Sequence, residues 1–126
     1  MFKFLVFLCF FFSLAAGEKN DDASVKCLKK DKKIHCSITF LSPFKLNEKA
    51  PFRFSLKSSE DENFSAPVAA DDFSCKDTDS GIQCKHISKT VADIYDYWFV
   101  ACKYEENKIV ACKTFSGTKR INREDN

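Results

Sequence analysis

Apolar and polar residues alternate along several segments of the chain, which is the pattern of strands that bury one face. The clearest cases are 34–40 and 52–57, in which every second residue is apolar. Short segments of this kind are separated by polar stretches that contain turn-forming residues. The whole pattern predicts about eight strands, near 24–30, 33–41, 52–57, 66–70, 73–77, 81–87, 95–104 and 108–115.

Helical periodicity is scarce, and its best case is a short segment near 88–96. There Ser88 could cap a helix whose apolar face would include Val91 and Ile94. The sequence therefore predicts an all-β fold. We expect a small disulfide-stabilised antiparallel β-sandwich or half-open barrel of about 7–8 strands, with at most one short helix near 88–96.

The first residues have the three parts of a secretory signal peptide. Lys3 supplies the positive charge, 4–14 an apolar stretch, and 15–17 the small residues needed for cleavage. The apolar stretch is shorter than the roughly 20 residues that cross a bilayer, and no later segment is longer, so we expect a secreted, extracellular protein without a membrane span. The expected division is a signal peptide over 1–17, a single secreted β domain over 18–116 and a flexible polar tail over 117–126.

Composition adds a limit on the class of partner. The chain has 126 residues, which suits one domain, and 20 Lys and Arg against 18 Asp and Glu. This near balance disfavours a protein built mainly to hold nucleic acid, which usually has a strong basic excess. The charge is nevertheless uneven, because 26–33 is rich in lysine and 58–72 is acidic.

Seven cysteines are present, and removal of the leader with Cys9 leaves an even six. An even number in a short exported chain predicts a disulfide framework. The six form three pairs that enclose eight, eight and nine residues: Cys27 with Cys36, Cys75 with Cys84, and Cys102 with Cys112. Each pair reads as the two sides of a hairpin, and the third needs a three-residue loop or a bulge. This geometry favours local bridges, while bridges between hairpins remain the alternative.

Candidate chemistry is limited. The cysteine spacing is not that of zinc knuckles, and we expect no metal and no cofactor. One enzymatic alternative is a small secreted ribonuclease-like hydrolase in which His35 and His86 act as acid and base. The residues Asn63-Phe64-Ser65 form an N-glycosylation sequon within the acidic segment, and the alternative there is an unmodified loop.

Two surfaces are candidates for binding. The first hairpin could contact an acidic lipid, glycan or protein, or could be a solvated edge. Its lysines are Lys29, Lys30, Lys32 and Lys33. The strand 95–99 is the second candidate: Tyr95, Tyr97 and Phe99 could face outward as an aromatic patch, or the strand could be covered on both faces.

In size, leader and cysteine number, the chain resembles the small secreted cysteine-rich proteins that pathogens and venomous animals export as effectors or toxins. That resemblance implies a monomeric, non-enzymatic binding protein, with a role in virulence, that acts on an extracellular or host protein or glycan. The ribonuclease-like hydrolase is the alternative function. Attack on membranes through the lysine hairpin is a third, and the small net charge of +2 counts against it.

Overall fold

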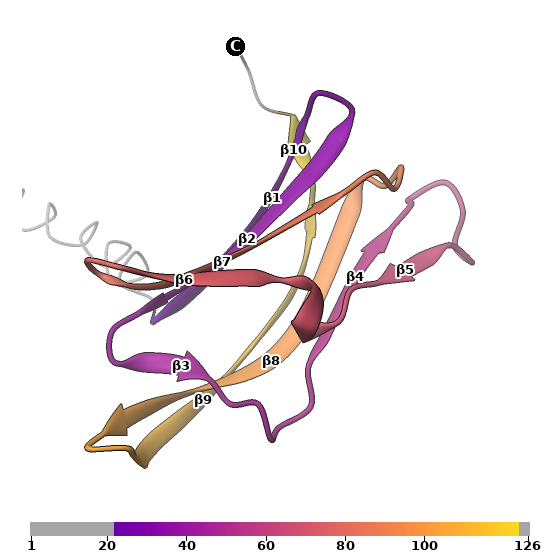
Figure 1. Cartoon of the computed structure of the whole chain (residues 1–126). Coiled ribbons are helices and arrows are strands. Elements are labelled where there is room, and N and C mark those ends of the chain that lie inside the picture. Colours follow the sequence, from indigo (N-terminus) through magenta and orange to yellow (C-terminus); the bar gives the residue numbers. More distant parts are fainter. Residues whose placement is uncertain (1–21, 124–126) are drawn as a thin grey trace, which may run out of the picture.

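The structure, a computed structural model, describes residues 22–123. Within this range the chain forms ten strands and one 3₁₀ turn (Figure 1). The elements are β1 (Ala23–Lys30), β2 (Lys33–Leu41), β3 (Phe44–Leu46), β4 (Arg53–Lys57), β5 (Ser65–Pro67), η1 (Ala70–Asp72), β6 (Ser74–Thr78), β7 (Gly81–Ser88), β8 (Ile94–Glu105), β9 (Lys108–Arg120) and β10 (Asn122–Arg123). The predicted signal peptide over 1–17 lies outside the described residues.

The strands form two sheets that pack face to face. Sheet A has the order β10-β1-β2-β7-β6, and sheet B has the order β3-β8-β4-β5, with β9 also paired to β8. All the pairs are antiparallel except β10, which lies parallel to β1. The predicted all-β fold is confirmed, and of the two expected architectures, a sandwich or a half-open barrel, the structure is sandwich-like.

Tight turns set the register of the first and third hairpins. Asp31 and Lys32 have φ of 54° and 67°, and Glu106 and Asn107 have φ of 55° and 67°. Two successive residues with positive φ are the mark of a type I′ turn, whose twist suits a two-residue hairpin. In the third hairpin the register shifts between Lys103 and Tyr104, so the odd residue is absorbed by a bulge rather than by a longer loop.

Each disulfide joins two residues that lie directly opposite each other in a hairpin. The bonds are Cys27–Cys36, Cys75–Cys84 and Cys102–Cys112, with Cα atoms 4.0, 3.9 and 4.0 Å apart. This is the local pairing that the hairpin spacing favours. On the chain-entropy model each short loop contributes about 2–3 kcal/mol to the free energy of unfolding.

Aromatic rings fill the space between the sheets. Phe40 of sheet A meets Phe99 of sheet B edge-on, with ring centroids 5.9 Å apart. Phe54 of sheet B lies 5.2 Å from Phe73, which precedes β6 of sheet A. Such pairs contribute about 0.5–1.5 kcal/mol each beyond the burial of their area, so these contacts hold the two sheets against each other.

The short helix predicted near 88–96 is absent, and the reason lies in its proposed cap. Ser88 ends β7 opposite Ile34, and its hydroxyl accepts the amide N–H of Thr90, which makes a local turn. The amide N–H of Asp93 then donates to the carbonyl of Lys57 at 3.0 Å, and β8 begins one residue later. The segment therefore connects two strands instead of forming a helix.

The predicted flexible tail over 117–126 also differs from what is found. Residues 117–120 continue β9 beside the first half of β8, and 122–123 form β10 beside β1. Between these strands the amide N–H of Ile121 donates to the carbonyl of Asp93 at 2.8 Å. This segment therefore links sheet B to sheet A, and 124–126 lie outside the described residues.

Asp93 holds three segments together where β8 begins. Its carboxylate accepts the amide N–H of Ser59 at 2.7 Å and the Ser59 hydroxyl, and it lies 3.9 Å from Arg120 Nη1. The Ser59 hydroxyl is the main cause that lowers the pKa of Asp93 below its ordinary value, and the Ser59 amide adds to it.

Gly81 is predicted to be irreplaceable at the start of β7. It has φ of 155°, and a Cβ built there would lie 1.9 Å from the carbonyl oxygen of Phe40. Gly81→Ala is expected to lower the free energy of unfolding by about 3 kcal/mol, measured by urea denaturation. Gly117→Ala is the control, because the atoms nearest its Cβ would be side-chain atoms of Tyr97, the closest being the hydroxyl at 3.0 Å, and not backbone atoms. An equal loss in both variants would contradict the backbone clash as the cause.

Asp93→Asn is predicted to destabilise the protein in a pH-dependent way. Because the pKa of Asp93 in the folded state is lowered, its carboxylate stabilises the fold above its unfolded pKa of about 3.9. That contribution is lost as the pH falls through the folded pKa. The Tm difference from wild type is therefore expected to be constant above about pH 5 and to shrink below about pH 4. Asp77→Asn, an exposed change on β6, is the control, and a pH-independent Tm difference for Asp93→Asn would refute the account.

Candidate functional site

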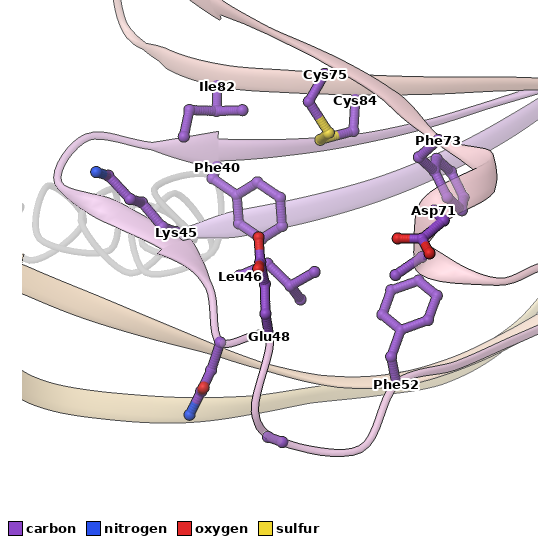
Figure 2. Close-up of a pocket in the computed structure, with 13 residues that line it drawn as sticks. Phe40, Lys45, Leu46, Glu48, Phe52, Asp71, Phe73, Cys75, Ile82 and Cys84 are labelled. Atoms are coloured by element: carbon purple, nitrogen blue, oxygen red, sulfur yellow. A yellow bond between two sulfur atoms is a disulfide. The ribbon is translucent and has the colours of Figure 1, made fainter.

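An apolar cleft opens between the two sheets at the edge formed by β6 and β3 (Figure 2). It has a volume of about 590 Å³, within the range of natural ligand sites. Its apolar walls come from both sheets and from the segments between them: Phe40, Leu46, Phe52, Phe73 and Ile82. Polar side chains lie among these walls, namely Lys45, Asn47, Glu48 and Asp71.

The alternation of β2 and β7 builds the sheet A side of the cleft. Phe40 lies directly opposite Ile82, and two residues further along β7 lies Cys84, bonded to Cys75. Because opposed residues in a ladder share a face, these side chains all point toward sheet B. The disulfide between Cys75 and Cys84 therefore forms part of the wall (Figure 2).

Two short structured segments close the remaining sides. The loop after β3 is held by Asn47. Its side-chain oxygen accepts a hydrogen bond from the backbone N–H of Lys49 at 3.0 Å, and its backbone carbonyl accepts one from the backbone N–H of Ala50 at 3.2 Å. The 3₁₀ turn is held by Asp72. Its carboxylate accepts a hydrogen bond from the backbone N–H of Ala69, and its backbone N–H donates to the Ala69 carbonyl. Both segments are thus fixed by local hydrogen bonds.

The aromatic walls are fixed by the core behind them. The ring of Phe52 lies 6.1 Å from Phe73 and 6.1 Å from Phe99, and Phe40 is 2% exposed. A wall that is already packed loses little conformational entropy when a ligand binds. The cleft is therefore a preformed site suited to apolar groups.

His35 and His86 do not converge. In the β2–β7 ladder Cys36 lies opposite His86, so His86 points to the inner face while His35, one residue away, points to the outer face. Nδ1 of His86 lies 3.0 Å from the carbonyl oxygen of Asp72, and its ring packs 5.5 Å from Phe73. The sheet therefore separates the two imidazoles instead of presenting them to one substrate.

Of the two alternatives for 95–99, the outward aromatic patch of Tyr95, Tyr97 and Phe99 is wrong. Tyr95 is 4% exposed, Phe99 is fully buried, and half-buried Tyr97 packs against the core. The cause is the pairing with β4, which sets Leu56 opposite Tyr95 and Phe54 opposite Tyr97 on the inner face. Burial also raises the pKa of the Tyr95 hydroxyl.

The lysines of the first hairpin are divided between the two faces of sheet A. Lys30 and Lys33 lie opposite each other and point outward, whereas half-buried Lys29 points inward beside Arg123 of β10. Lys32 occupies the turn itself. The hairpin thus supplies cations to the outer face, but its lysines do not make one separate patch.

Asn63 is exposed in the loop between β4 and β5, where its backbone N–H donates a hydrogen bond to the Asp61 carboxylate at 3.0 Å. The next residue, Phe64, turns toward the core and packs against it. The side chain of Asn63 is therefore open to modification.

The residues that line the cleft were not identified as a site from the sequence. Alternation marks Phe40, Phe73 and Ile82 as core positions, but nothing local shows that their outer edges remain uncovered. The cleft joins segments that are more than 40 residues apart in the chain, from Phe40 to Cys84. The one feature of the sequence that could have indicated the cleft is an apolar residue just outside a strand, such as Phe52 before β4.

Comparisons with protein-family models, with curated proteins and with solved structures give no significant match. Within residues 22–123 there is no helix long and apolar enough to cross a membrane. In the same range no cluster of three or more His, Cys, Asp or Glu side chains is arranged to hold a metal ion.

Proposed function

We propose that the protein is an exported, non-enzymatic binding protein of effector or toxin type, which recognises an extracellular or host protein through the cleft. The observation that carries this proposal is the preformed apolar cavity of about 590 Å³ between β3 and β6. Apolar pockets bordered by a few polar groups are the usual form of binding sites in proteins.

Export is supported by two independent features. The leader over 1–17 has the charged, apolar and small-residue parts of a signal peptide. All six cysteines of the β domain are paired in disulfides, which persist in oxidising compartments.

A protein partner is supported by the position of the cleft at a sheet edge. β6 ends the strand order of sheet A, and among the described residues it pairs with β7 alone. An extended segment of a partner could add to such an edge and place alternate side chains in an adjacent pocket. We therefore propose an extended partner segment with an apolar side chain that enters between Phe52 and Ile82.

Recognition rather than turnover is favoured by the arrangement of the ionisable groups. The walls of the cleft are aromatic and aliphatic, and its carboxylates, Glu48 and Asp71, are exposed. The two histidines of the hydrolase alternative lie on opposite faces of sheet A. General acid–base catalysis needs both groups within reach of one substrate, so the geometry supports binding as the function.

Blocking the cleft is predicted to weaken the binding of extended peptides. The oxidised protein is used to select from a phage-displayed library of linear 12-residue peptides, and the enriched peptides are expected to carry apolar residues at alternate positions. Ala70→Glu puts a carboxylate at the wall of the cleft and is expected to weaken these peptides about tenfold or more, because apolar burial is lost. Binding is measured by fluorescence anisotropy.

Ala69→Glu is the matched control, since Ala69 is exposed, adjacent in the chain and not part of the cleft wall. It is expected to bind as the wild type does. Peptides without apolar residues, or peptides that bind Ala70→Glu as tightly as Ala69→Glu, would show that the cleft is not the binding site.

Processing of the leader and glycosylation at Asn63 are predicted together. When the full chain is expressed in insect cells, the medium is expected to contain a protein that begins at Glu18 and carries one N-linked glycan, because Asn63 is exposed in a sequon. Intact-mass spectrometry before and after glycosidase treatment measures both. Asn63→Gln should remove the glycan mass alone, and retention of the uncleaved chain in the cells would contradict export.

A further inference from the structure

The outer face of sheet A, the face turned away from sheet B, is basic and carries no carboxylate on its four longer strands. The alternation of side chains assigns every second residue of β1, β2, β6 and β7 to this face. None of these residues is Asp or Glu. Five of them are lysines: Lys26, Lys30, Lys33, Lys76 and Lys85.

A shallow hollow lies at the centre of this face. Ser37 of β2 is opposite Lys26 on one side and Lys85 on the other. Since neighbouring strands are about 4.8 Å apart, the two lysines flank Ser37 at a separation of about 10 Å between their backbones. The hollow has a volume of about 320 Å³, and Leu28, His35 and Ile87 line it together with these residues. Cys36 and His86 also border it, although their side chains point to the inner face of the sheet.

The charge at the hollow is not neutralised within the described residues. Lys26 and Lys85 are exposed, and the ion pairs formed in residues 22–123 engage other cations, namely Lys57, Lys103, Lys113 and Arg120. Lys26, Lys76 and Lys85 lie on different strands of this face with no carboxylate among its outward positions, an arrangement that complements a ligand with regularly repeated anions. The balanced charge of the whole chain conceals this one-sided distribution.

The other side chains of the face indicate which polyanion fits. Ser37, Thr39 and Gln83 supply hydroxyl and amide groups that can hydrogen-bond to sugar hydroxyls. Single-stranded nucleic acids need aromatic platforms for their bases, and the outward positions of these four strands contain no Phe, Tyr or Trp. Binding at a lipid surface favours a continuous apolar face, whereas the apolar residues at outward positions here, Leu28, Leu41 and Ile87, are few and stand among lysines and hydroxyl groups.

We propose that the outer face of sheet A binds a sulfated polysaccharide, with sulfate groups held by Lys26 and Lys85 beside Ser37. This face lies on the opposite side of sheet A from the cleft. The inference therefore does not depend on the function proposed for the cleft.

The test uses heparin as the sulfated polysaccharide, with the oxidised protein collected from the medium after export. The wild type is expected to bind immobilised heparin and to be released by salt. Lys26→Gln/Lys85→Gln is expected to bind about tenfold more weakly and to elute at lower salt, because two cationic contacts are lost. Circular dichroism and unchanged disulfide content confirm that the variant is folded.

Lys49→Gln/Lys108→Gln is the matched control, because both lysines are exposed and lie away from this face. It is expected to bind heparin as the wild type does. Equal weakening in both double variants would mean non-specific attraction and would overturn the proposal, as would unchanged binding by Lys26→Gln/Lys85→Gln.

Three further probes discriminate between classes of polyanion. Desulfated heparin, a single-stranded DNA oligonucleotide and vesicles containing anionic phospholipid are each expected to bind more weakly than heparin at the same salt concentration. Tighter binding to the DNA or to the vesicles would mean that the ligand of this face belongs to that class and is not a polysaccharide.

Ala70→Glu, the cleft variant, is expected to leave heparin binding unchanged. This result distinguishes failure of the proposed polysaccharide site from failure of the proposed cleft site.

Discussion

The pairing register of sheet A is the constraint on which the arrangement of both surfaces depends. Side chains in a strand alternate between faces, so a slip of one residue would turn every inward group outward. β2 is paired on both sides, and the disulfide between Cys27 and Cys36 fixes its register against β1 through one directly opposed pair. With that register, the apolar residues of β2 face sheet B, and Ser37 lies outside between two lysines. The same constraint separates His35 from His86.

Phe73 shows how the thin core also builds the site. Its ring contacts Phe54 of sheet B, Phe52 beside the cleft and His86 of β7. One side chain thus connects the two sheets, packs against the imidazole of His86 and forms a wall of the cavity. A small domain has little apolar surface to bury, so residues that stabilise the fold must also shape its surface. The disulfides make this arrangement possible, because they lower the stability that the core alone must provide.

The strands of the fold could be predicted from the sequence because half-buried strands leave a period of two in the chain. That pattern shows that Tyr95, Tyr97 and Phe99 share one face, but not which face is buried. The choice is made by β4, whose Phe54 and Leu56 lie opposite Tyr97 and Tyr95. Two segments show no period of two in the sequence: the second half of β9, and β10. Both are exposed edge strands with polar residues on both faces. The cleft could not be predicted, because its walls meet only through tertiary packing.

Both proposed sites use the same strand in alternate positions. In β7, Ile82 and Cys84 point into the cleft, while Gln83 and Lys85 point to the outer face. A ligand in one site is thus separated from the other site by the thickness of a single sheet, and the two do not compete for space. A protein held on a sulfated polysaccharide through Lys26 and Lys85 would keep its cleft open to a second molecule. If both proposals hold, the protein acts as a two-sided adaptor; what the structure itself shows is that the disulfide-fixed register assigns charge to one side of sheet A and apolar contact to the other.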